Sequence, residues 1–209
     1  MCSETAKIVK KSVSLSSMDI IQAIEIFALV TGIAYVLLEI LQKNAMWVVG
    51  ILTSAACAFS FAIQHSWGMM ALNGYYFVMS FIGLWQWKKD GAKVGEDVIH
   101  INPLPRKTAL WSAGAFVGGS LAVIAVLRAL GDSASVLDAS ATVLSVIATW
   151  WLARAYLQEW LLWVVADAMT TLLCITTGQY WLTILYTAYT VSAVYGYFHW
   201  KRKGIVIGV

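Results

Sequence analysis

The sequence has little charge and almost no proline. Only 12% of its 209 residues are charged, two are proline, and 60% are hydrophobic. Soluble domains have about 25% charged and about half apolar residues, and a domain of this length could not bury a larger apolar share. The sequence therefore indicates an integral membrane protein. Its net charge of +3 comes from basic residues at the ends of apolar runs, so we expect the lipid bilayer, and no nucleic acid, as a partner.

Residues for several kinds of chemistry are also missing. The three cysteines are odd in number, and Cys57 and Cys174 lie inside apolar runs, which predicts neither a disulfide framework nor a metal site. The chain has no glycine-rich phosphate loop and no His-Glu-x-x-His motif. Every lysine lies outside the apolar runs, which excludes a retinal protein that needs a buried lysine. We predict no catalytic residue, no metal and no cofactor, and therefore no enzyme.

Seven apolar runs approach the length of about 20 residues that a membrane-spanning helix needs. Transmembrane strands would be shorter and would alternate polar and apolar residues, so we expect an all-α membrane protein. The short connections QKNA and TTGQ predict that neighbouring helices run antiparallel. The expected spans are 19–41, 46–64, 68–87, 108–130, 135–153, 160–176 and 180–200.

Basic residues set the expected orientation, because loops rich in Lys and Arg remain in the cytoplasm. Ten basic residues fall on one side of the predicted spans and four on the other. We therefore place the N-terminus outside and the C-terminus in the cytoplasm of a plasma (inner) membrane. The ten are Lys43, Lys88, Lys89, Lys93, Arg106, Lys107, Arg154, Lys201, Arg202 and Lys203, and the four are Lys7, Lys10, Lys11 and Arg128.

An internal repeat appears when the sequence is shifted by 113 positions. The shift aligns Trp47 with Trp160, Tyr76 with Tyr189, Val78 with Val191, Gly83 with Gly196, Trp87 with Trp200 and Lys88 with Lys201. The first three helices therefore correspond to the last three, and the odd helix between them lets both triplets enter the membrane from the same side. The predicted parts are an N-terminal tail (1–18), repeat 1 (19–87), a cytoplasmic loop (88–107), a linker helix (108–130), repeat 2 (135–200) and a C-terminal tail (201–209).

The two halves differ where polar and aromatic residues are concerned. The first half has Gly50 and Ser54 where the second has Trp163 and Asp167. An acid within an apolar helix is costly in lipid unless it faces a cavity, so Trp163 and Asp167 are candidates for binding a ligand between the halves. Trp47 and Trp160 are either ligand contacts or members of the aromatic belt at the membrane surface.

Further candidates lie on the third and seventh helices. Asn73 and Tyr76 are spaced to share one face of helix 68–87, and Tyr186 and Tyr189 share one face of helix 180–200. Asn73 and Tyr189 are the better ligand contacts of the four, although packing alone also explains them. Gly83 and Gly196 are expected to allow close helix contact.

Two more acids have simpler explanations. Glu39 precedes Lys43 by four residues, the favourable order for an ion pair on a helix surface. Asp138 stands near the outer end of its helix and would attract cations to an outer mouth or simply be solvated.

Three strings of the sequence resemble motifs of the PnuC vitamin transporters. They are EWLLWVVAD, GLWQWKK and GYFHWKR, and the resemblance covers about residues 20–203. It implies seven core helices in two three-helix bundles, related to the SWEET fold. It also implies facilitated diffusion of an unphosphorylated B-vitamin, chiefly nicotinamide riboside, with relatives for thiamine and riboflavin, which a cytoplasmic vitamin kinase then traps. A membrane sensor or assembly subunit without transport is the alternative class, and an oligomer is possible.

By this resemblance, Trp160 and Trp163 pack against the ligand's ring and Asp167 is the polar residue that follows. The sequence departs from nicotinamide riboside transporters, which usually have Asn at the position of Asp167 and commonly Gln at that of Asn73. An ionised carboxylate only accepts hydrogen bonds, and thiamine offers both an amino group and a positive charge. We therefore expect thiamine slightly ahead of nicotinamide riboside, bound between helices 2, 3, 6 and 7.

Overall fold

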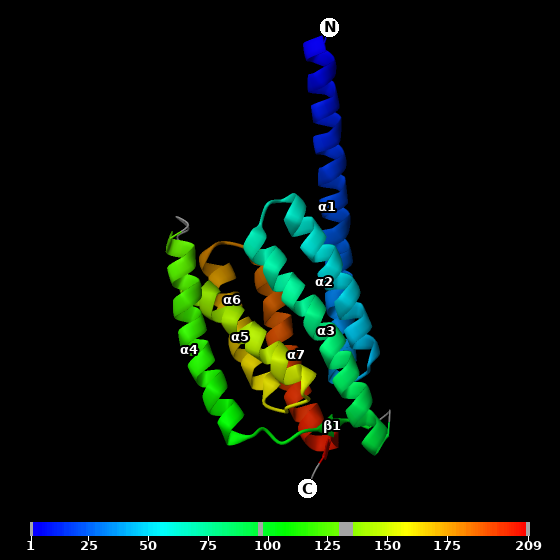
Figure 1. Cartoon of the computed structure of the whole chain (residues 1–209), viewed down its shortest axis with the longest axis vertical. Coiled ribbons are helices and arrows are strands. Elements are labelled where there is room, and N and C mark those ends of the chain that lie inside the picture. Colours follow the sequence, from blue (N-terminus) through cyan, green and yellow to red (C-terminus); the bar gives the residue numbers. More distant parts are fainter. Residues whose placement is uncertain (1, 96–97, 130–135, 208–209) are drawn as a thin grey trace.

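The computed structural model describes residues 2–95, 98–129 and 136–207, with side chains from Met18 onward except that of Leu127. Seven helices occupy the described residues (Figure 1): α1 (Cys2–Ile40), α2 (Ala45–Ile63), α3 (Trp67–Val94), α4 (Arg106–Ala129), α5 (Val136–Ala153), α6 (Glu159–Thr176) and α7 (Tyr180–Lys203). The all-α prediction is confirmed, and the ends of the helices follow the predicted apolar runs closely in most cases.

Two helices are longer than the sequence predicts. Helix α1 extends back to Cys2 through the predicted tail, which contains neither glycine nor proline to end it. Helix α3 continues through the first residues of the predicted loop and ends at Val94, where Gly95 adopts a φ of 109°. Glycine adopts such a conformation without a steric penalty, so the helix stops there and not at Trp87.

Within the described residues, five helices contain stretches long and apolar enough to cross a membrane, so the chain is a multi-pass membrane protein. They are Met18–Ile40, Ala45–Ile63, Arg106–Val126, Val136–Ala153 and Glu159–Thr176. Helices α3 and α7 have the required length, at 28 and 24 residues, but they carry more polar residues and end in basic clusters. Their lower apolarity fits helices that line an internal cavity.

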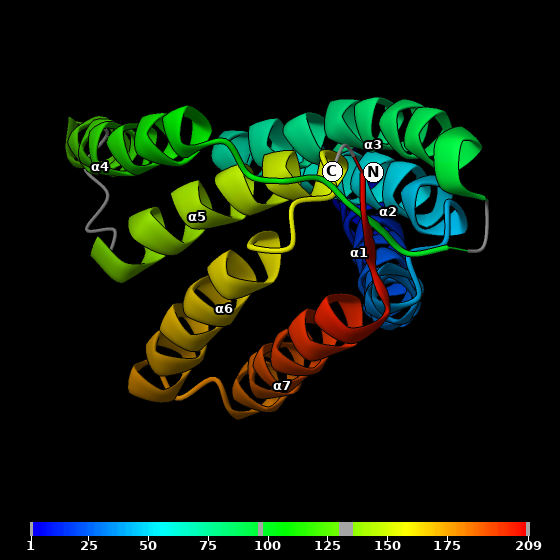
Figure 2. The same ribbon diagram turned by 90° about the horizontal axis from the view of Figure 1, so that it is seen from below.

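Successive contacts join α1, α2, α3, α5, α6 and α7 into a closed ring, which Figure 2 shows from one end. Within the ring α1, α2 and α3 pack in sequence, as do α5, α6 and α7, and the two triplets meet where α3 packs on α5 and α7 packs on α1. Helix α4 lies outside the ring against α5. The N-terminus and the C-terminus lie at opposite ends of the molecule (Figure 1).

Helices α1, α3, α5 and α7 end, and α2, α4 and α6 begin, at the end of the molecule near the C-terminus (Figure 1), which we call the basic end. The basic residues in and beside these helix ends are Lys43, Lys88, Lys89, Lys93, Arg106, Lys107, Arg154, Lys201, Arg202 and Lys203. Here the connection after α3 forms strand β1 (His100–Ile101), which pairs in parallel with β2 (Ile205–Val206) after α7. Gln42 donates from Nε2 to the His100 carbonyl at 2.9 Å and accepts from the His100 N–H at 2.7 Å. Residues 98–102 of the predicted loop therefore form a strap that contacts both triplets.

Asp90 anchors the same strap just beyond the predicted end of the third span. Its carboxylate accepts hydrogen bonds from Lys93, Gln86 and Asn102, and Asn102 Nδ2 also donates to the carbonyl of Arg154. Burial alone would raise the pKa of Asp90, but these hydrogen bonds and the charge of Lys93 outweigh it, so the pKa lies below its ordinary value. Asp90 therefore favours its ionised form while it holds the strap.

Positions 113 apart share the same local geometry in the two triplets. Gln42 and Ala155, which end the turns after α1 and α5, have φ values of 49° and 52°. Trp47 packs so tightly on Gly83 that an added Cβ would lie 2.4 Å from the indole, and Trp160 packs on Gly196 in the same way at 2.5 Å. The glycines therefore allow the close helix contact that the sequence predicts.

Candidate functional site

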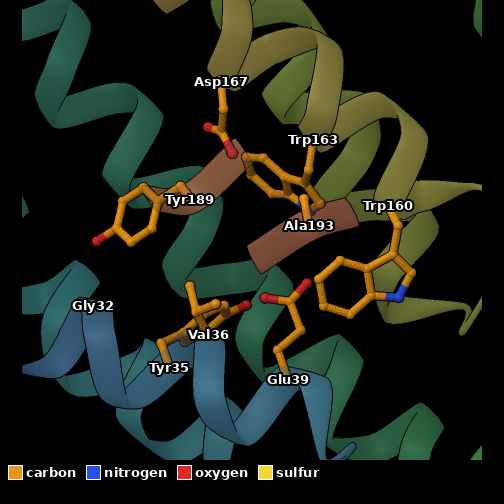
Figure 3. Close-up of a pocket in the computed structure, with 9 residues that line it drawn as sticks. All are labelled: Gly32, Tyr35, Val36, Glu39, Trp160, Trp163, Asp167, Tyr189 and Ala193. Carbon is orange, nitrogen blue, oxygen red and sulfur yellow. The ribbon is translucent and has the colours of Figure 1, made fainter. Parts of the chain in front are cut away.

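Two adjoining cavities lie between the triplets. The small cavity, about 190 Å³, is bounded by α1, α6 and α7 and is shown in Figure 3; the large cavity, about 480 Å³, also reaches α2, α3 and α5. Both are lined by Gly32, Tyr35, Trp163, Asp167 and Tyr189. The two cavities therefore form one site with a common aromatic and acidic wall.

Trp163 and Asp167 occupy the position that the comparison of the two halves predicts. Both belong to α6 and line both cavities, and Figure 3 shows the Asp167 carboxylate pointing into the space between the helices. The Asp167 side chain is only 8% exposed. An acid in this place is screened from lipid by the ring of helices and is available to a bound molecule.

The tyrosines and the asparagine predicted on α3 and α7 meet across the large cavity. Asn73 and Tyr76 line it from α3, and Tyr186 and Tyr189 line it from α7. Tyr186 and Tyr189 also pack edge to face at 5.9 Å, which fixes their rings. The structure thus brings six of the eight predicted residues, Trp163, Asp167 and these four, to the large cavity.

Trp47 and Trp160 are the remaining two, and the structure separates them. Trp160 lines the small cavity, whereas Trp47 is fully buried among α2 and α3 and reaches neither cavity. The prediction of Trp47 as a binding residue is therefore wrong in this structure, because Gly83 admits its indole into the helix interface and Trp87 covers it at 5.2 Å. With exposures of 0% and 2%, neither tryptophan faces a membrane surface.

Helices α1 and α5 also contribute to the site, which sequence reasoning placed between helices 2, 3, 6 and 7 alone. From α1 come Gly32, Tyr35, Val36 and Glu39, and from α5 come Asp138, Ala141, Thr142, Ser145 and Thr149. The hydroxyl-bearing face of α5 was the sequence feature that could have revealed this contribution. Asp138, expected near an outer mouth, lines the large cavity.

Glu39 is the clearest error of the sequence analysis. It is 4% exposed and lines the small cavity, so a solvent-exposed ion pair with Lys43 does not describe it. Its Oε1 has no hydrogen-bond partner among the described residues. The spacing to Lys43 concealed the residue's role, because an acid at the end of an apolar helix is more often solvated than buried.

The polar groups of the large cavity present mainly hydrogen-bond acceptors. The hydroxyls of Ser54, Ser80, Ser145 and Thr149 each donate to the carbonyl four residues earlier in their own helix, at 2.6 to 2.9 Å. Asn73 Nδ2 donates likewise to the Met69 carbonyl at 2.9 Å. These four hydroxyls therefore keep oxygen lone pairs for donors of a ligand, while Asn73 Nδ2 retains a second N–H beyond the one that this bond uses.

The site is lined by acidic side chains. Asp167 and Asp138 line the large cavity and Asp167 and Glu39 the small one, and no Lys, Arg or His lines either cavity among the residues that the structure describes. The described residues also contain no cluster of three or more His, Cys, Asp or Glu side chains able to hold a metal ion. Acidic groups beside aromatic faces favour a flat, positively charged organic molecule rich in hydrogen-bond donors.

Comparison with known proteins identifies the family of this chain. A family model described as nicotinamide mononucleotide transporter matches residues 22–202. The chain belongs to this PnuC-type transporter family. Proteins of the family are membrane transporters and not enzymes, and the resemblance seen in the three sequence motifs is therefore confirmed.

Relatives with the name nicotinamide riboside transporter PnuC occur in several bacteria. The Haemophilus influenzae protein is 30% identical over 129 residues, which cover 61% of this chain and 56% of that protein. The Neisseria mucosa protein is 27% identical over 185 residues, covering 84% of this chain and 70% of that protein. This chain thus spans little more than half the length of the Haemophilus relative and over two thirds of the Neisseria one.

The fold has a counterpart of known structure. The crystal structure of the vitamin B3 transporter PnuC matches with a TM-score of 0.66 and 23% identity, over 90% of each chain. This similarity covers most of the chain and shows that the PnuC fold is shared.

Proposed function

We propose that this PnuC-type protein is a facilitative transporter for uptake of nicotinamide riboside. The observation that carries the proposal is the cavity between the triplets, which combines aromatic walls, acceptor-only hydroxyls and Asp167. Nicotinamide riboside has a flat, positively charged ring and a ribose whose hydroxyls donate hydrogen bonds. Each of these features has a complementary surface in the cavity.

The same chemistry favours the nucleoside over its phosphorylated nucleotide. A phosphate group carries about −1.5 to −2 charge at neutral pH and usually requires arginine, lysine or a helix N-terminus as a partner. The described lining residues include no basic side chain, and Asp138, Asp167 and Glu39 would repel an anion. The matching family model is named after the mononucleotide. This cavity nevertheless favours the unphosphorylated nucleoside as its substrate.

Thiamine is the second candidate, because Asp167 can accept from the aminopyrimidine and oppose the positive thiazolium. The named relatives, however, are nicotinamide riboside transporters. The preference for thiamine that we drew from Asp167 has no support beyond that residue, and we now place nicotinamide riboside first. Riboflavin, which is larger and uncharged, follows both.

The proposed transport cycle rests on the arrangement of the triplets. We infer that α1–α3 and α5–α7 are parallel, SWEET-like repeats, that α3 and α7 complete seven spans, and that one triplet rocks against the other. Matching turns and matching tryptophan–glycine contacts at positions 113 apart support the repeat. The basic end would face the cytoplasm and the N-terminus the outside. In the cytoplasm, a vitamin kinase would phosphorylate the transported vitamin and so trap it. The oligomeric state is a separate quantity to measure.

Binding and flux should be measured on the purified full-length protein. Calorimetry with nicotinamide riboside, nicotinamide mononucleotide, thiamine and riboflavin gives the ligand preference, and proteoliposomes loaded with labelled nicotinamide riboside, without a kinase, give the flux. We expect nicotinamide riboside to bind best and to equilibrate across the membrane. Binding without flux would indicate the sensor or assembly subunit, and tighter binding of thiamine or of the mononucleotide would contradict the proposed substrate.

A further inference from the structure

We propose that Glu39 is a second binding group for the positive charge of the transported molecule, on the path between Asp167 and the basic end. The proposal rests on the proposed function, because it concerns how a cationic vitamin leaves the large cavity. It starts from the small cavity, where Glu39 and Asp167 face the same space from α1 and α6 (Figure 3).

The position of Glu39 follows from the geometry of the helices. Glu39 lies seven residues beyond Gly32 on α1, a distance of about 10 Å along the helix axis. Gly32 borders both cavities, whereas Glu39 borders only the small one, at the side toward the basic end. On α6, Trp160 and Asp167 are also seven residues apart, and Trp160 borders only the small cavity whereas Asp167 borders both. A molecule that moves from the large cavity toward the basic end therefore meets Glu39 after Asp167.

A layer of tryptophans closes the small cavity just beyond Glu39. Trp200 packs edge to face on Trp160 at 5.4 Å, and its Nε1 donates to the carbonyls of Glu39 and Ile40 at 3.2 and 3.0 Å. Trp87 lies at 6.0 Å from Trp200 and completes the layer. The side chain of Glu39 thus points into the cavity while its backbone is tied to the closed end.

The carboxylate of Glu39 is available for a ligand. The side chain is 4% exposed, and its Oε1 has no hydrogen-bond partner among the described residues. A buried carboxylate oxygen without a hydrogen-bond partner is costly, and a cation that enters the cavity offsets part of this cost. Aromatic faces of Trp160, Trp163 and Tyr35 surround it and would contribute cation–π attraction to the same molecule.

A second acid is buried near this end of the small cavity. Glu159, in the first turn of α6 beside Trp160, is fully buried and lines neither cavity. Neither of its carboxylate oxygens has a hydrogen-bond partner in the part of the chain that the structure describes. Asp167 and Glu39 are therefore the acids that a molecule in the small cavity meets, and Glu159 is buried next to Trp160 in the wall of that cavity.

The test separates charge from shape by comparing two probes. One is nicotinamide riboside, and the other is its reduced dihydropyridine form, which keeps the ribose and the carboxamide but has no positive charge. Uptake of both into proteoliposomes is measured for the wild type, Glu39→Gln and Glu39→Asp. The control is Asp19→Asn, which removes a carboxylate from an exposed position of the same helix. Melting temperatures in detergent show which variants are folded.

We expect Glu39→Gln to lower uptake of the cation about tenfold while uptake of the neutral probe changes less than twofold. Glu39→Asp should lower the preference for the cation about threefold, because the carboxylate withdraws by one carbon, and Asp19→Asn should leave it unchanged. An unchanged preference in folded Glu39→Gln, or in Glu39→Asp if the glutamine variant does not fold, would overturn the role of Glu39. Equal losses of uptake for the cationic and the neutral probe in Glu39→Gln would also overturn the role of Glu39. Absence of nicotinamide riboside flux in the wild type would instead refute the proposed function, and with it this inference.

Discussion

The two triplets share their packing and differ in their chemistry. In both, a tryptophan packs on a glycine of the last helix and against a second tryptophan four residues after that glycine. These second tryptophans, Trp87 and Trp200, also reach across to the other triplet. Trp87 Nε1 donates to the Leu152 carbonyl, and Trp200 Nε1 donates to the carbonyl of Glu39. Leu152 and Glu39 are themselves 113 positions apart. The halves are thus tied together by the same pair of bonds in both directions.

The two triplets differ in chemistry from one helical turn after Trp47 and Trp160. Gly50 and Ser54 in α2 are replaced in α6 by Trp163 and Asp167, and only the second pair supplies a large aromatic face and a charge to the cavity. Repeated residues therefore hold the helices together, and unrepeated residues define what can bind. The predictions below test this division by changing one kind of residue at a time.

The largest effect is expected when the second triplet receives the residue of the first. Asp167→Ser removes the carboxylate that faces both cavities and should weaken binding of nicotinamide riboside roughly 10- to 150-fold, since a hydrogen bond or contact with a charged group contributes about 1.5–3 kcal/mol. Calorimetry on the purified variant measures the change. Asp167→Asn keeps the shape and isolates the charge, and if its affinity and ligand preference equal those of the wild type, this acid has no part in binding.

The repeated glycines should give the next largest effect, on stability and in both halves alike. A Cβ at Gly83 or Gly196 would lie 2.4 or 2.5 Å from a buried indole, so Gly83→Ala and Gly196→Ala should each destabilise the fold by about 1–3 kcal/mol. Thermal unfolding in detergent measures this loss. Gly74→Ala is the matched control on α3, because nothing lies within 4 Å of its added Cβ. A loss in one half only would contradict the structural equivalence of the triplets.

A smaller effect is expected from the aromatic face that only the second triplet has. Trp163→Leu keeps an apolar wall but removes the electron-rich ring, which should cost about 0.5–2 kcal/mol in binding of the cationic nicotinamide riboside. The uncharged dihydropyridine form should lose less, because it makes no cation–π contact. Equal losses for the two ligands, measured by calorimetry, would show that Trp163 acts by shape alone.

The smallest effect concerns a difference at the basic end, where the first triplet has Asp90 and the matched position of the second is Lys203. The pKa of Asp90 is lower in the folded protein than its ordinary value, so its contribution to stability is present above about pH 4 and is lost as the pH falls through the folded-state pKa. The melting temperature should therefore fall below about pH 4, and Asp90→Asn should show a weaker dependence over that range. Identical acid profiles would exclude Asp90 as the source.

The sequence predicted much of this architecture because its evidence is periodic and local. Long apolar runs placed the helices, and the register of 113 residues aligned the tryptophan–glycine contacts without knowledge of the fold. Asp167 and Trp163 emerged as candidates because they break that register. Trp47 was predicted wrongly because the repeat aligns it with Trp160. Alignment in the repeat does not bring a tryptophan to the cavity, and of the two only Trp160 lines it.

Sequence by itself determined that this chain crosses a membrane as helices and that its second half carries an acid where the first has serine. These properties depend on composition and spacing along one chain. Only the tertiary structure decided that α1 and α5 complete the cavity, that Asp90 and Gln42 tie the connecting strand in place, and that Glu39 faces inward. Each of these depends on residues far apart in the sequence, whose proximity arises from the packing of one triplet against the other.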